Sequence, residues 1–301
     1  MSQLSDCCIS GHLHDGKPKG AVSVIEGMKC YIAAPESGNK DKAILFISDV
    51  FGYHLPVQST YFHANYRMLN CLQTNTPPMD STSTSRISST VISQLKWLIL
   101  DDAIPESILS RLVPTKQQAE KKTVVEKAAD AAASGAAIGP WIIKHREAVI
   151  MPLIQKFLRY IRSEHKKVGA VGFCWGARYA ILLTYADADP YVDCAVANHP
   201  SFLSMPSEIE KIAKPVAIEV GDSDSIFGQK DIEQTREIFQ KKKDCEIEVY
   251  EDQVHGFTIR GDLSIEKDKK AKEKAAQRVS STSSLLISVC FVSQQTHVVV
   301  N

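Results

Sequence analysis

A cysteine set between two glycines is the feature of this sequence that most clearly suggests chemistry. The stretch Gly172-Phe-Cys174-Trp-Gly176 follows an apolar run and precedes a segment with a helical pattern. In G-x-S-x-G sequences the nucleophile lies on a tight turn between a strand and a helix, and here a cysteine takes the place of the serine. The flanking glycines keep Cβ atoms out of the contact between strand and helix, and the helix N-terminus favours a thiolate. The alternative interpretation of Cys174 is a buried structural thiol.

A cysteine nucleophile needs a base, and the base needs a group that orients it. Asp222 and Asp224 follow one apolar run, and His255 follows the next run along the chain. Cys174, Asp222 and His255 therefore occur in the order nucleophile, acid, histidine that is typical of α/β-hydrolases. We predict a triad of these three residues, with Asp224 as the nearest competitor of Asp222. Taken singly, Asp222 is also compatible with a turn-capping role and His255 with a surface loop.

The elements that must position these residues alternate between strand-like and helix-like patterns. Short, mostly apolar runs predict buried strands, and the longer amphipathic segments between them predict helices, which together indicate a largely parallel sheet with helices on both faces. The expected fold is α/β, of the α/β-hydrolase type. Strands are expected at 43–48, 168–173, 192–197, 215–220 and 246–250, a hairpin at 20–33, and helices at 144–164, 175–185, 231–242 and 264–279.

Composition excludes several classes of protein. The chain has 301 residues, with 35 Lys and Arg against 35 Asp and Glu, so its formal net charge is zero. A nucleic-acid binder needs an excess of basic residues, which this chain lacks. A chain without net charge is also not expected to be attracted to an anionic membrane surface. The first thirty residues lack a basic segment followed by an apolar core, so we expect a soluble cytoplasmic protein with reduced thiols. No Cys or His spacing predicts a zinc site, and we expect neither a metal nor an organic cofactor.

Several motifs together resemble the dienelactone hydrolases, a cysteine-using branch of the α/β-hydrolase fold, and most closely its eukaryotic, largely fungal members. The matching motifs cover most of residues 1–57 and 104–279. They are Cys7-Cys8 with Gly11, His14, Gly16, Pro18 and Gly20, then Asp49-Val-Phe-Gly52-Tyr-His54, Gly172-Phe-Cys-Trp-Gly176, Gly221-Asp222 and His255-Gly-Phe257.

The resemblance implies hydrolysis of a lactone or carboxylic ester through an acyl-enzyme on Cys174. In this mechanism His255 activates the cysteine, and Asp222 supports the histidine. The resemblance also implies that the backbone N–H groups of Val50 and Trp175 form the oxyanion hole. An acidic residue at the position of Asp49 would lie near the thiol and influence its protonation, although bacterial members carry the longer Glu there. Arg260, just beyond the histidine, is a plausible partner for a substrate carboxylate, or else a solvated surface arginine.

Two segments depart from the family pattern within the expected single domain of residues 1–279. A Ser/Thr-rich stretch of about 58–103 replaces a helix and a strand, and only the run Leu95 to Leu100 could substitute for that strand. The tail 280–301 carries no Asp, Glu, Lys or Arg and is expected to be poorly ordered. Our hypothesis is that both segments are translated non-coding or frame-shifted sequence from a faulty gene model. Transcript reads that span both segments in this frame would refute it.

The expected partner is a small ester or lactone, bound by a monomer or weak dimer. Two other functions use the same residues. One is a non-catalytic or redox-sensing protein with Cys174 as a reactive thiol. The other is a thioesterase or acyltransferase on the same fold.

Overall fold

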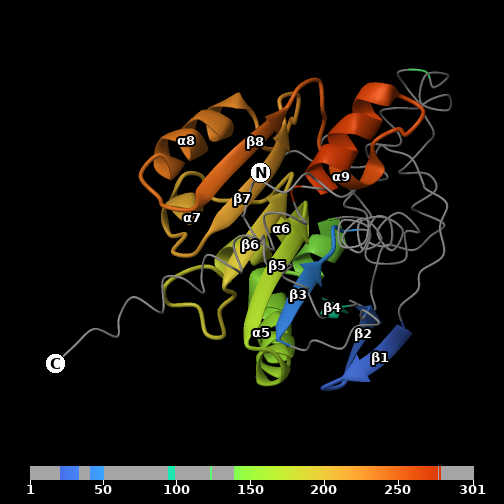
Figure 1. Ribbon diagram of the computed structural model, residues 1–301, viewed down its shortest axis with the longest axis vertical. Helices are drawn as coiled ribbons and strands as arrows, with labels where there is room; N and C mark the ends of the chain where they lie inside the picture. The colour runs from blue at the N-terminus through green and yellow to red at the C-terminus, as the bar shows by residue number, and fades with distance from the viewer. Residues whose placement is uncertain are drawn as a thin grey trace, which may run out of the picture.

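An eight-stranded sheet forms the centre of the molecule in the computed structural model, with helices around it (Figure 1). The structure describes residues 21–33, 41–50, 94–98, 123, 139–276 and 278. The strand order is β1-β2-β4-β3-β5-β6-β7-β8. The strands are β1 (Ala21–Ile25), β2 (Met28–Ala33), β3 (Lys42–Ile47), β4 (Gln94–Leu98), β5 (Lys167–Phe173), β6 (Cys194–Asn198), β7 (Val216–Gly221) and β8 (Cys245–Tyr250).

The strands from β4 to β8 are parallel, and β1 and β2 form an antiparallel hairpin at one end of the sheet. The central strands are buried along their whole length, as their apolar runs predict. Large side chains such as Phe46 and Phe173 are almost completely buried in the same core. Each such side chain stabilises the fold by about 1.5–3 kcal/mol. The predicted α/β fold with a mostly parallel sheet is confirmed.

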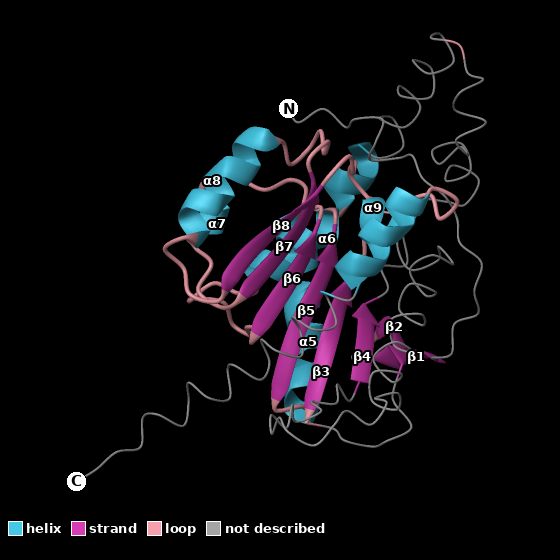
Figure 2. Cartoon of the chain, turned by 45° about the horizontal axis from the view of Figure 1, so that its top comes forward, coloured by secondary structure: helices cyan, strands magenta, loops and turns pink. Residues whose placement is uncertain are grey.

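The helices of the described part are α5 (Glu147–Glu164), α6 (Trp175–Leu182), α7 (Ser207–Glu210), α8 (Gln229–Phe239) and α9 (Phe257–Arg260), with further helical residues at 139–144 and 266–276. Figure 2 shows α5 and α6 passing behind the strands. Helix α5 buries one stripe, which includes Ile150, Ile154, Phe157 and Ile161, at the spacing of an amphipathic helix. The predicted helices are present, with ends that differ by a few residues.

Strand β4 lies inside the stretch that departs from the family pattern. Its backbone pairs in parallel with β3, where Ile44 is opposite Leu95, and antiparallel with β2, where Cys30 is opposite Leu98. The expectation that the run beginning at Leu95 supplies the missing strand is confirmed, with bounds of Gln94–Leu98. Most of 58–103, the whole tail 280–301 and the motif residues 7–20 and 51–54 lie outside the described residues.

Candidate active site

Cys174 occupies a strained turn between β5 and α6. Its φ is 51° and its ψ is −114°, a backbone conformation that costs a non-glycine residue energy and occurs mainly at functional sites. A Cβ atom on Gly172 would lie 2.4 Å from the carbonyl oxygen of Gly176. Glycine at position 172 is therefore required for the close passage of strand and helix, as the sequence pattern predicts.

The end of β3 runs directly beneath the start of α6. A Cβ atom on Gly176 would lie 2.3 Å from the carbonyl oxygens of both Ile47 and Ser48. This close approach brings the following residues, Asp49 and Val50, next to the cysteine turn, and both are buried. Trp175 is the first residue of α6, so its N–H has no acceptor within the helix. The two predicted oxyanion donors, at Val50 and Trp175, thus belong to backbone segments that border Cys174.

His255 lies in the loop between β8 and α9 and pairs with Asp224. Its Nδ1 is 2.9 Å from Oδ2 of Asp224, and both side chains are buried. The prediction that Asp222 orients the histidine is therefore wrong in this structure, and its nearest competitor takes the position. Asp222 is partly exposed, and its Oδ1 accepts a hydrogen bond from the hydroxyl of Ser223.

Backbone contacts after β7 explain why the second aspartate reaches the histidine. The N–H of Asp222 donates to the carbonyl of Tyr250 at the end of β8, and the N–H of Ser223 donates to the carbonyl of Gln253 in the loop that follows β8. The turn then folds Asp224 inward, where its Oδ1 accepts the N–H groups of Ile226 and Phe227. Its Oδ2 is left for His255. Sequence spacing alone does not distinguish these two positions.

The surroundings of His255 favour its protonated form. Burial by itself would lower the pKa of this imidazole, but Cys174 and Asp224 outweigh burial and raise the pKa to about 10. The Nε2 atom makes no hydrogen bond of good geometry among the described side chains, although the Cys174 sulfur is close enough to act on the ring by charge and by hydrogen bonding. A protonated imidazole next to the sulfur is the environment that in general activates a cysteine as a nucleophile.

The turn after β6 contributes two further residues to the site. Ser201 has its Oγ 3.4 Å from Sγ of Cys174, and His199 packs edge-on against the ring of His255 at 4.9 Å between centroids. Burial and the neighbouring charges of His255 and Arg260 lower the pKa of His199 well below its usual value, so it is neutral. Sequence reasoning missed both residues. The available signal was their position just beyond a buried strand, the rule that singled out Asp222 and His255.

Arg260 and Asp49, each predicted to act on substrate or thiol, form a buried ion pair with each other. Gly256, with a φ of 86°, makes room for this arginine, because a Cβ atom there would lie 2.2 Å from its Nη2. Lys272 is also buried nearby and donates to the carbonyl of Ile259. Burial and the charge of Arg260 lower the pKa of Lys272 to about 7. The interpretation of Arg260 as a solvated surface residue is wrong.

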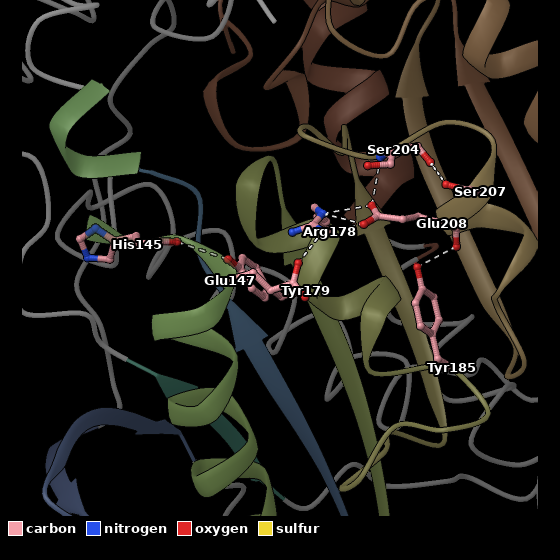
Figure 3. A network of polar contacts seen from close by, with 8 residues as sticks. All are labelled: His145, Glu147, Arg178, Tyr179, Tyr185, Ser204, Ser207 and Glu208. Carbon is pink, nitrogen blue, oxygen red and sulfur yellow. Dashed lines mark hydrogen bonds and ion pairs between the residues drawn. The ribbon is translucent and has the colours of Figure 1, made fainter. Parts of the chain in front are cut away.

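Side chains on α6 anchor this helix, which begins directly after Cys174 (Figure 3). Arg178 donates from Nε and Nη2 to the carboxylate of Glu208 and also bonds Glu147 at the start of α5. The hydroxyl of Tyr179 donates to the carbonyl of His145 at 3.3 Å. Two-point contacts between arginine and carboxylate fix orientation as well as distance. These contacts hold the turn at Cys174 against α5 and α7.

Over the described ranges, no three His, Cys, Asp or Glu side chains cluster in a way that suits a metal ion. Among those same residues, no helix has the length and apolar character needed to cross a membrane.

A parallel sheet with a strained, glycine-flanked turn after β5 and a buried histidine after β8 is the arrangement of an α/β-hydrolase. The family model described as "Dienelactone hydrolase family" matches residues 116–284. The chain belongs to the dienelactone hydrolase family.

Relatives agree with this assignment, and a solved structure shares the fold. The chain is 23% identical over 274 residues to "Hydrolase pyvD" of Aspergillus violaceofuscus, which covers 90% of this chain and 92% of that protein. It is 25% identical over 276 residues to "Dienlactone hydrolase 1" of Gibberella moniliformis, with 89% and 88% covered. The crystal structure of a putative dienelactone hydrolase from Klebsiella pneumoniae superimposes with a TM-score of 0.52 at 17% identity, covering 87% of this chain and 96% of that one.

Proposed function

We propose that this protein is a cysteine-dependent hydrolase that cleaves a carboxylic ester or lactone through an acyl-enzyme on Cys174. The observation that best supports the proposal is that three features meet at the C-terminal ends of the strands. They are the strained turn at Cys174, the buried pair of His255 and Asp224, and the effect of Cys174 on the pKa of His255. Membership in the dienelactone hydrolase family supports the reaction class.

In the first step the Cys174 sulfur, as thiolate, attacks the carbonyl carbon of the substrate. A carbon–sulfur bond forms, and the carbonyl π electrons move to oxygen, where the N–H groups of Val50 and Trp175 are proposed to stabilise the charge. The tetrahedral intermediate then collapses as the carbon–oxygen bond breaks. His255 gives its proton to the departing alkoxide, which in a lactone stays attached to the acyl chain.

In the second step water releases the acyl group. Neutral His255 now takes a proton from water, and the resulting hydroxide attacks the thioester carbon. The carbon–sulfur bond breaks and returns the electron pair to Cys174, while His255 keeps the proton. The enzyme is thus restored as thiolate and imidazolium. The products are a carboxylic acid and an alcohol from an ester, or a single hydroxy acid from a lactone. Asp224 holds the ring so that Nε2 serves both proton transfers.

Arg260 is proposed to bind a carboxylate on the substrate, as the sequence suggests. Because Arg260 is already paired with Asp49, an incoming carboxylate would compete with Asp49 for the guanidinium. If the substrate carboxylate takes the place of Asp49 on the guanidinium, the Asp49 carboxylate loses its positive partner. The negative charge near Cys174 would then increase. This gives Asp49 a role in adjusting the thiol despite its side chain being shorter than Glu.

The test is pre-steady-state hydrolysis of p-nitrophenyl acetate, followed by steady-state assays on a lactone and a thioester. We expect a burst of p-nitrophenol close to one equivalent per enzyme, which is lost in Cys174→Ala and in His255→Gln. Cys245→Ser is the matched control, because the thiol of Cys245 bonds Lys214 and lies outside the site. Preference for the thioester would favour a thioesterase. Oxidant-reversible labelling of Cys174 without turnover would overturn the hydrolase and favour a redox sensor.

A further inference from the structure

The short turn after β6 holds Ser201 against the nucleophile by two contacts. Its backbone N–H donates to the carbonyl oxygen of Cys174 at 3.2 Å, and its Oγ lies 3.4 Å from Sγ of the same residue. Both side chains are buried. A hydroxyl held from two points, away from competing water, keeps a fixed direction toward the sulfur.

The turn itself is fixed by contacts on its other side. His199 adopts a φ of 38°, and its N–H donates to the carbonyl of Glu219 on β7 at 2.6 Å. Its Nε2 is 2.8 Å from Oγ1 of Thr258 on α9. A left-handed backbone at a histidine persists only where the surrounding structure holds it, and such strain clusters at functional sites. The position of Ser201 is therefore set by β7 and α9 as well as by Cys174.

We infer that Ser201 is a further catalytic residue, whose hydroxyl donates a hydrogen bond to the Cys174 sulfur while that sulfur carries negative charge. The direction of the bond follows from the location of the proton. In the proposed mechanism His255 holds the thiol proton before attack, so across the 3.4 Å contact the sulfur accepts and the hydroxyl of Ser201 donates. A hydrogen bond to the charged form of a group favours that form.

Ser201 acts on the thiolate of the resting site, before the substrate is attacked. The serine gives up no proton in any step. Its bond to sulfur is strongest before attack and weakens as the sulfur electron pair moves into the new carbon–sulfur bond. Removal of the hydroxyl should therefore make the thiolate harder to form and, once formed, more basic and more nucleophilic. A merely structural serine would have neither effect.

Other charges around the sulfur stay in place when this hydroxyl is removed. One is His255, which is paired with Asp224, and the other is the ion pair of Asp49 with Arg260. The neutral ring of His199 packs on His255. Ser201→Ala deletes one buried oxygen and adds no atom. Ser207→Ala is the matched control, since the hydroxyl of Ser207 bonds only Ser204 in the same connection.

The experiment is the rate of alkylation of Cys174 by iodoacetamide as a function of pH, read from the peptide that contains it. For Ser201→Ala we expect the midpoint of the profile to move upward by about one pH unit. We expect its limiting rate at high pH to equal or exceed the wild-type rate by up to about threefold. Ser201→Thr, which keeps the hydroxyl, should restore the wild-type midpoint, and Ser207→Ala should not move it.

The inference rests on the proposed function only in taking Cys174 as the nucleophile, and alkylation requires no turnover. A Ser201→Ala profile that superimposes on the wild type would overturn it. So would a profile whose limiting rate falls with no change of midpoint, because that result indicates damage to the site. If wild-type Cys174 itself fails to react at any pH, the proposed function fails first, and the two failures are thereby distinguished.

Discussion

Asp224 and His255 are 31 residues apart in the chain, yet Oδ2 of the aspartate lies 2.9 Å from Nδ1 of the histidine. The contact joins the loop after β7 to the loop after β8, and the two strands are neighbours in the sheet. A carboxylate on Nδ1 leaves Nε2 as the nitrogen for proton transfer. The sheet topology therefore determines which nitrogen of His255 is available to Cys174.

Replacement of Asp224 by asparagine should lower kcat for ester hydrolysis by at least about 100-fold. The amide cannot stabilise the imidazolium, and it can present its NH₂ group to Nδ1 and so select the wrong tautomer. Asp222→Asn is the matched control and should change kcat less than about threefold, since the side chain of Asp222 bonds only Ser223 at the loop surface. A larger loss in Asp222→Asn than in Asp224→Asn would contradict the assignment.

Gly176→Ala should destabilise the protein and impair catalysis together. The new Cβ would lie 2.3 Å from two carbonyl oxygens of the β3 end, so backbone must move. We expect a loss of about 1–3 kcal/mol in the free energy of unfolding. A displacement of the nucleophile by about 1 Å should lower kcat/KM by about 100-fold. Gly139→Ala, where a Cβ meets nothing within 4 Å, is the control. Equal unfolding curves for both variants would show that the close approach is unimportant.

The protonated state of His255 should appear in the pH dependence of stability. Its pKa rises from 6.5 to about 10 on folding, so above pH 6.5 the folded chain keeps a proton that the unfolded chain loses. The free energy of unfolding relative to His255→Gln should therefore be greatest below about pH 6.5 and decline as pH rises toward 10. Urea unfolding at pH 6, 8 and 10 measures this difference. A difference that grows with pH would contradict the imidazolium.

Glu219 should give a second effect of pH on stability, in a lower pH range than that of His255. This carboxyl is buried on β7, where it accepts the Tyr250 hydroxyl at 2.6 Å and pairs with Arg278. Burial raises its pKa from 4.5 to about 7, although Tyr250 and Arg278 oppose the rise.

The folded state therefore binds the Glu219 proton more tightly than the unfolded state does. The stabilisation from this proton is complete below about pH 4.5 and is lost as pH rises to about 7. Thermal unfolding of the wild type and Glu219→Gln across this range tests the sign. The advantage of the wild type over the variant should shrink with rising pH, and a growing advantage would show that the ion pair with Arg278 dominates instead.

The fold was predictable because its signals are local. Buried parallel strands are short apolar runs, and the turn at Cys174 requires glycine at 172 and 176 for steric reasons that the sequence displays directly. The short run beginning at Leu95 also proved to be a strand, because its backbone pairs in parallel with β3.

The finer contacts of the site were not predictable because they depend on loop conformation. Spacing placed both Asp222 and Asp224 beyond a strand, and only the backbone bonds to Tyr250 and Gln253 select the second. Ser201 carries no motif of its own, and its contact with Cys174 depends on the backbone of the turn after β6. The pairing of Arg260 with Asp49 joins residues 211 positions apart and is visible only in three dimensions.

The most direct test is to identify the covalent intermediate. The protein is mixed with an activated ester, quenched with acid within the burst phase, digested and analysed by peptide mass spectrometry. We predict that the peptide containing Cys174 gains the mass of the acyl group, and that the adduct is absent in Cys174→Ala. Full hydrolytic activity in Cys174→Ala, or an acyl group found on another residue at the same rate, would contradict the role of this sulfur as nucleophile.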